Sequence, residues 1–212
     1  MKTKLERFFF AIILAPLAPL AAMMLAWWGS YSLLPETWIP AGTVAGFLLG
    51  IIADTFVLKG LVERACQLRM IFWVTVYLFY TVGVFGFFMG VPVFNALLAI
   101  PAGFVMAARV AESRPEAESV SRTARRTAWF TTGIVFGVCA ASAAFALLSS
   151  STPSDLRGML GLGFEVTQGM ILVLILVGGA GLLALNWVLT WGSTRLAYKF
   201  LRPEAWTPVP AA

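Results

Sequence analysis

An aspartate that continues a regular series of glycines is the residue best placed to do chemistry in this sequence. Gly42, Gly46 and Gly50 recur every fourth residue, and Asp54 is the next member of the series. Its surroundings are apolar, and an ionisable side chain in an apolar membrane segment is costly and usually faces the protein interior. Asp54 is therefore a candidate for binding an ion or a proton, and a structural ion pair with a base such as Lys59 is the open alternative.

Polar residues in other apolar runs fall at a depth similar to that of Asp54. Together they predict an inner layer that lines a substrate or ion site between helices, formed by Asp54, Thr75, Asn186 and Thr190. Ordinary hydrogen bonding between helices is the alternative for these residues. A second, outer site is predicted from Asn95, Glu165 and Gln168. Solvation of Glu165 by water among the lipid headgroups is its alternative.

Small residues at four-residue spacing predict close packing of helices, because they let two backbones approach. They form a glycine zipper in one apolar run and two alanine pairs in another: Gly42, Gly46 and Gly50, and Ala11, Ala15, Ala18 and Ala22. Such faces pack against a helix of the same chain or against a partner subunit.

The chemistry that the sequence lacks is also informative. Histidine is absent, which removes the commonest general base and a frequent metal ligand. Cys66 and Cys139 have no paired spacing, and the two aspartates, Asp54 and Asp155, lie far apart. We therefore expect no enzyme activity, no cofactor and no metal site. The net charge of +5 comes from cations that flank apolar runs, so nucleic-acid binding is not expected.

The elements that must position these residues are membrane-spanning helices. Of the 212 residues, 60% are hydrophobic and 12% are charged, and the mean hydropathy is +0.88, which is too apolar for a soluble domain. A span needs about 20 apolar residues. The sequence predicts an all-α, polytopic bundle in one transmembrane domain, 1–212, with six spans near residues 8–28, 40–58, 70–88, 93–108, 129–148 and 166–191.

Two stretches of the sequence are too long for single spans, and the first of them carries no charge. Met70 to Ala108 divides into two spans if the chain turns at residues 89–92, where Gly90 and Pro92 favour a turn. The stretch that begins at Pro153 divides into a short interfacial helix, 153–162, and the last span, with the break near Gly161 and Gly163. Residues 195–212 are expected to form a cytoplasmic tail.

The distribution of basic residues tests this arrangement. Six spans place fourteen of the fifteen Lys and Arg residues on one side of the membrane, and only Arg157 on the other. Cytoplasmic connections carry the excess of Lys and Arg. The pattern therefore predicts a multi-pass protein of the inner (plasma) membrane with both termini in the cytoplasm.

These features predict a small-solute or ion transporter, or its membrane-embedded binding component. The alternative is a non-catalytic subunit or scaffold that docks on a larger membrane complex through its glycine or alanine face. The expected partners are the lipid bilayer and either other membrane subunits or further copies of this chain.

Overall fold

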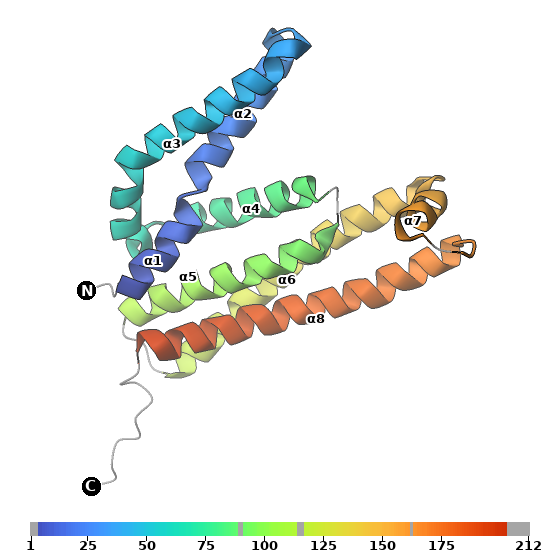
Figure 1. Cartoon of the computed structure of the whole chain (residues 1–212). Coiled ribbons are helices and arrows are strands. Elements are labelled where there is room, and N and C mark those ends of the chain that lie inside the picture. Colours follow the sequence, from blue (N-terminus) through green and yellow to red (C-terminus); the bar gives the residue numbers. More distant parts are fainter. Residues whose placement is uncertain (1–3, 89–90, 114–116, 162, 203–212) are drawn as a thin grey trace. The chain divides into compact units, whose positions relative to one another are not determined.

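The structure is a computed structural model and describes residues 4–88, 91–113, 117–161 and 163–202. These residues form helices and no strand, and six helical segments are long and apolar enough to cross a membrane. The prediction of an all-α membrane bundle with six spans is confirmed. The helices in chain order (Figure 1) are α1 (Lys4–Leu14), α2 (Leu17–Leu33), η1 (Glu36–Trp38), α3 (Ile39–Arg64), η2 (Ala65–Gln67), α4 (Met70–Phe87), η3 (Pro92–Leu98), α5 (Ala99–Glu112), α6 (Ala117–Leu148), α7 (Thr152–Leu160) and α8 (Gln168–Leu201).

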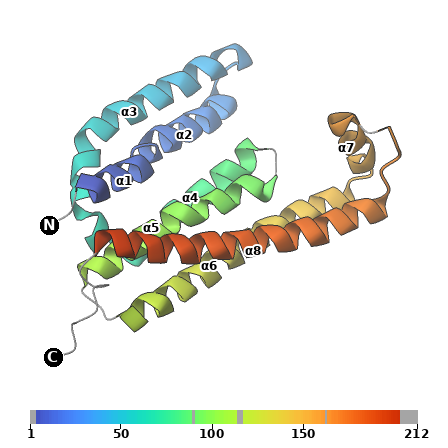
Figure 2. The same ribbon diagram turned by 60° about the horizontal axis from the view of Figure 1, so that its bottom comes forward.

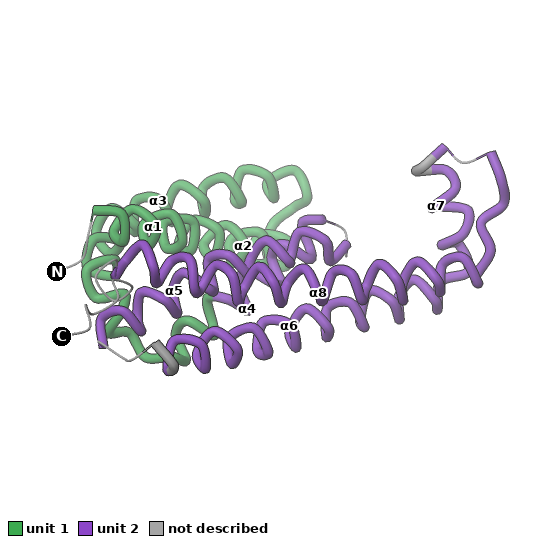
Figure 3. The backbone as a smooth tube through the Cα atoms, turned by 90° about the horizontal axis from the view of Figure 1, so that it is seen from below, with its two compact units in different colours: residues 1–76 green, residues 77–212 purple. Residues whose placement is uncertain are grey.

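The chain divides into two compact units, residues 1–76 and residues 77–212 (Figure 3). The first unit contains α1 to α3 and the start of α4, and the second contains the rest of α4 and α5 to α8. Some positions used in the predictions lie outside the described residues, namely Lys2, Arg114, residues 89–90 of the turn and residues 203–212 of the tail.

In the first unit, α2 and α3 pack closely along the glycine series (Figures 1 and 2). A Cβ atom added to Gly46 would lie 2.7 Å from the carbonyl oxygen of Ala22, and one added to Gly50 would lie 2.7 Å from another backbone oxygen of α2. At Gly42, an added Cβ atom would meet the side chain of Ser30, which also belongs to α2. Because even a methyl group does not fit at these points, the glycines allow the two backbones to approach.

The predicted first span consists of two helices. α1 ends at Leu14 and α2 begins at Leu17, and Pro16 between them cannot donate a backbone hydrogen bond. Backbone bonds from Ala15 to Ala11 (2.8 Å) and from Leu20 to Pro16 (3.0 Å) continue the helical pattern on both sides of the break. The proline therefore interrupts the span without ending it.

Aromatic side chains join α1 to the connection between α3 and α4 in the first unit. Phe10 of α1 is fully buried, and its ring centroid lies 5.6 Å from that of Trp73 at the start of α4. The indole nitrogen of Trp73 donates a hydrogen bond of 3.1 Å to the carbonyl oxygen of Ala65 in η2. These contacts fix the turn between α3 and α4 to α1.

In the second unit, α5, α6 and α8 lie side by side (Figure 2). From Leu182 onward, α8 buries one residue in every four: Leu182, Asn186, Thr190, Thr194 and Tyr198. α5 buries a matching series of small residues: Ala99, Gly103, Ala107 and Ala111. A Cβ atom added to Gly103 would lie 2.8 Å from the carbonyl oxygen of Thr190 and 2.9 Å from the backbone nitrogen of Thr194. α5 and α8 are therefore in backbone contact at Gly103.

A single arginine closes the carboxyl ends of α5 and α8. Arg202, which follows α8, donates from Nε (3.0 Å) and from Nη2 (2.7 Å) to the carbonyl oxygen of Ala111 in the last turn of α5. Carbonyl groups in the last turn of a helix have no partner within it, and they carry the negative end of the helix dipole. The guanidinium group satisfies one of them and joins the two helices.

Two boundaries of the last span differ from the prediction. α8 begins at Gln168 rather than near residue 166, because Thr167 is its N-cap and accepts a hydrogen bond of 3.3 Å from the backbone nitrogen of Met170. α8 then continues to Leu201, so residues 195–201 of the predicted tail are helical. The helix stops just before Pro203, whose ring disfavours helical backbone in the preceding residue.

The short helix predicted before the last span is present as α7, Thr152–Leu160. Gly161 ends it with φ of 61°, a left-handed backbone that glycine adopts without strain. The predicted break near Gly161 is confirmed, and it separates α7 from α8.

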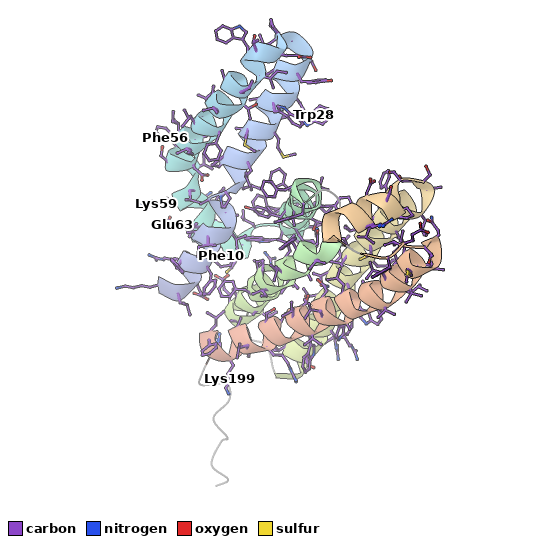
Figure 4. The ribbon with its side chains drawn as sticks, turned by 45° about the vertical axis from the view of Figure 1, so that its right-hand side comes forward. Phe10, Trp28, Phe56, Lys59, Glu63 and Lys199 are labelled. Atoms are coloured by element: carbon purple, nitrogen blue, oxygen red, sulfur yellow. The ribbon has the colours of Figure 1, made fainter. Side chains whose placement is uncertain are left out.

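Large apolar side chains cover the outer faces of the helices. Phe56 on α3 is 81% exposed and Trp28 on α2 is 62% exposed, and both point away from their helices (Figure 4). Such surfaces are unfavourable in water but suit contact with lipid. The chain is an integral membrane protein.

Candidate binding site

Asn186 and Thr190 lie one turn apart in the middle of α8, and neither side chain is exposed. Both face α6, where Thr131 and Thr132 lie opposite them. The amide nitrogen of Asn186 donates to Oγ1 of Thr131 (3.2 Å) and to Oγ1 of Thr132 (3.0 Å). The hydroxyl groups of Thr131 and Thr190 are 2.8 Å apart. We call these four residues the Asn186 cluster.

The threonine hydroxyls of this cluster also bond to their own helices. Thr190 donates to the carbonyl oxygen of Asn186 (2.9 Å), and Thr131 is within hydrogen-bond distance of that of Ala128 (3.2 Å). One turn further along α8, Thr194 donates to the carbonyl oxygen of Thr190 (2.7 Å). Each hydroxyl has a single proton, so the bond between Thr131 and Thr190 competes with these backbone bonds.

One end of the Asn186 amide is left without a partner. Its Oδ1 atom is buried and makes no hydrogen bond to any described residue. Rotating the amide by half a turn would exchange oxygen and nitrogen, and one end would still be unpaired because only one side of the group faces the threonines. A buried polar atom without a partner costs about 1–3 kcal/mol. In the orientation of the structure, with the nitrogen on the threonines, Asn186 Oδ1 is available to accept a hydrogen bond or to coordinate a cation.

The other two residues of the predicted inner layer belong to the first unit. Asp54 is half-buried on α3. Thr75 is exposed on α4, and its hydroxyl donates to the carbonyl oxygen of Ile71 one turn earlier (3.0 Å). The structure thus joins Asn186 to Thr190, and the inclusion of Asp54 and Thr75 in one layer with them stays a prediction.

The three residues of the predicted outer site have separate surroundings. Asn95 in η3 is fully buried, and its amide nitrogen donates to the carbonyl oxygen of Thr81 in α4 (2.8 Å). Gln168 is exposed at the start of α8 and donates to the carbonyl oxygen of Leu147 at the end of α6 (3.1 Å). Glu165 is exposed in the connection before α8. No hydrogen bond joins these three side chains in the described part of the chain.

Asn95 belongs to a second group of buried polar atoms, which the sequence reasoning did not assemble. Its Oδ1 atom, Oγ1 of Thr81 and Oη of Tyr77 are buried without a hydrogen-bond partner of suitable geometry among the described residues. All three lie in α4 and η3 of the second unit. The irregular backbone of η3 within a span is a common feature of ligand sites in membrane proteins.

Several residues that shape the Asn186 cluster were missed from the sequence. Thr131 and Thr132 are adjacent hydroxyl residues in the fifth apolar run, and Gly103 belongs to a small-residue series in the fourth. The spacing of that series, with Ala99, Gly103 and Ala107 four apart, is a signal that could have been found. The threonines carry no signal of their own, because threonine is common in membrane helices as an internal hydrogen-bonding residue.

The donor set of the cluster is neutral and rich in oxygen. Among the described residues there is no group of three or more His, Cys, Asp or Glu side chains that could hold a metal ion. Asn186 and the threonines offer only amide and hydroxyl groups.

Comparison of the chain with protein-family models, with curated proteins and with solved structures finds no match.

Proposed function

We propose that this chain is a non-enzymatic carrier for a small solute or ion, or the membrane-embedded binding component of one, and that the ligand binds at the Asn186 cluster. The supporting observation is the unpaired Oδ1 atom of Asn186, in a side chain with no exposed surface. Polar groups inside membrane spans are costly and are commonly retained for a substrate or ion path. A ligand that pairs with Oδ1 would remove that cost.

The chemistry of the cluster limits the ligand class. Its oxygen atoms carry no formal charge, so they suit a neutral molecule with a hydrogen-bond donor or a monovalent cation. An anion or a divalent cation would need countercharge that the cluster itself does not contain. Ordered water is the structural alternative, because water also fills buried polar sites.

Flux through liposomes that contain the purified chain tests this proposal. The probes are urea and glycerol, followed by light scattering, and radioactive sodium and rubidium ions. We expect at least one probe to cross faster than in protein-free liposomes. Asn186→Leu removes the acceptor while keeping the same number and branching of non-hydrogen side-chain atoms, and it should return that flux to the protein-free rate.

Two further variants make the flux test specific. Thr43→Val removes a hydroxyl that bonds within α3 to the carbonyl oxygen of Ile39 (2.8 Å), and it should keep the flux. Asp54→Asn tests the inner layer predicted from the sequence and should lower the flux if Asp54 acts with Asn186. Unchanged flux in a folded Asn186→Leu protein would exclude the Asn186 cluster as the site.

The competing proposal is a subunit or scaffold that docks through its small-residue faces. In the first unit, the glycines of α3 lie against Ala22, Ala26 and Ser30 of α2. The glycine face is therefore covered by α2, and docking through it would require the two helices to separate.

A further inference from the structure

The seam between α6 and α8 carries tryptophan and arginine side chains at one end. The two helices are antiparallel, since Thr131 of α6 contacts Thr190 of α8, whereas the later residue Val135 packs with the earlier residue Leu182. Residues that precede Thr131 on α6 therefore lie beside residues that follow Thr190 on α8. This relation brings the basic start of α6 and the basic end of α8 together.

A pair of tryptophans marks one level of the seam. The ring centroids of Trp129 on α6 and Trp187 on α8 are 4.6 Å apart, with an interplanar angle of 76°. Trp191 follows Trp187 by one turn on α8. Trp129 is 66% exposed and Trp191 is 36% exposed, so both rings present apolar surface to the surroundings. Tryptophan is enriched where the apolar core of a membrane meets water.

Three arginines lie one to two turns beyond the tryptophan pair, toward the same end. Arg125 and Arg126 precede Trp129 by four and three residues, which places them on its face of α6. On α8, the guanidinium carbon of Arg195 lies 4.4 Å from the centroid of Trp191. All three arginines are exposed. Stacking on Trp191 orients Arg195 without neutralising it.

The charge and the apolar surface together indicate the partner. We propose that this tryptophan–arginine seam (Arg125, Arg126, Trp129, Trp187, Trp191 and Arg195) binds the phosphate headgroup of an anionic phospholipid. Guanidinium groups bind phosphate oxygens in pairs of parallel hydrogen bonds. The exposed indole rings beside them cover the glycerol and the upper acyl chains, which a free phosphate ion would not use. Basic pockets between spans bind such headgroups in this way.

Thermal unfolding of the full chain in detergent, with lipid added back, tests the proposal. The probes are phosphatidylglycerol, phosphatidylcholine and inorganic phosphate. We expect phosphatidylglycerol to raise the midpoint of unfolding and to bind with measurable affinity, and phosphatidylcholine and inorganic phosphate to have little effect. Each cation near an anionic headgroup contributes about a fivefold change in affinity. The triple variant Arg125→Gln, Arg126→Gln and Arg195→Gln should therefore bind phosphatidylglycerol roughly 100-fold more weakly.

A matched triple variant controls for the loss of positive charge. Lys59, Arg64 and Arg69 are exposed cations of the first unit, and their replacement by Gln should leave phosphatidylglycerol binding within about twofold of the unchanged protein. Equal loss in both triple variants would overturn the proposal in favour of unspecific attraction. If inorganic phosphate displaced phosphatidylglycerol at a concentration similar to that of the lipid, the ligand would be phosphate rather than a phospholipid, and the proposal would be overturned. If the seam triple variant does not fold, Arg195→Gln alone should still weaken binding by about fivefold, and no change would contradict the seam.

Discussion

Asn186 couples two helices through one half of a single amide group. Its nitrogen reaches the hydroxyls of Thr131 and Thr132 on α6, while its oxygen has no partner among the described residues. A residue placed only to join α6 and α8 would use both ends of the amide where it could, because an unpaired buried oxygen is destabilising. The unpaired end is why binding, rather than packing alone, is proposed for this position.

The contribution of this contact to stability can be separated from its role in binding. In a double-mutant cycle of Asn186→Leu and Thr131→Val, we expect a coupling free energy of about 0.6 kcal/mol, the typical value for hydrogen bonds between membrane helices. The measurement is unfolding of the purified protein in increasing dodecyl sulfate. The cycle of Asn186→Leu with Thr43→Val, two residues in different units, should be additive within about 0.5 kcal/mol. A coupling free energy near zero between Asn186→Leu and Thr131→Val would contradict the hydrogen bond between these two side chains.

At the scale of elements, small residues decide which helices approach each other. The glycines of α3 meet α2, and Gly103 of α5 meets α8 near Thr190. In both places a backbone atom of the partner helix, which cannot move aside as a flexible side chain can, occupies the space that a Cβ atom would need. The glycine spacing in the sequence predicted a close approach, but it carried no information on which helix would be the partner.

Gly46→Leu should separate α2 from α3. The added side chain would meet the carbonyl oxygen of Ala22, so we expect the free energy of unfolding to fall by about 1–3 kcal/mol, as in other overpacked sites. Gly60 on the same helix has no atom within 4 Å of an added Cβ, and Gly60→Leu should change stability by less than about 1 kcal/mol. Dodecyl sulfate unfolding measures both variants. If Gly46→Leu keeps full stability but detaches a co-purifying membrane protein, the scaffold proposal gains.

At the scale of the whole molecule, the basic residues and the six candidate spans support one topology. An even number of spans returns the chain to the side on which it started. With the cations gathered on that side, the positive-inside rule predicts that both termini lie in the cytoplasm. We propose this orientation in the plasma membrane.

Labelling of single cysteines in intact cells tests the orientation. Cys66 and Cys139 are first replaced by Ala, since neither is disulfide-bonded and both would otherwise react with the label. Ser154 is exposed in α7, and we expect a membrane-impermeant maleimide to label the Ser154→Cys variant in intact cells. Ser113 is exposed after α5, and the Ser113→Cys variant should react only after the cells are opened. Labelling of Ser113→Cys in intact cells, together with protection of Ser154→Cys, would show that the orientation is the opposite of the one proposed.

The sequence by itself determined the class of the protein, the number of spans and where most of them end. These properties depend on local features, such as the length of an apolar run, the charge that ends it and the backbone of Gly161, and each can be evaluated without knowing the partners of a residue. The tertiary structure decided which polar groups meet. Asn186 and Thr190 were candidates from their depth, but their pairing with Thr131 and Thr132 depends on how α6 and α8 are rotated about their axes. That rotation is set by packing along the whole seam, at pairs such as Val135 and Leu182, and no local pattern encodes it.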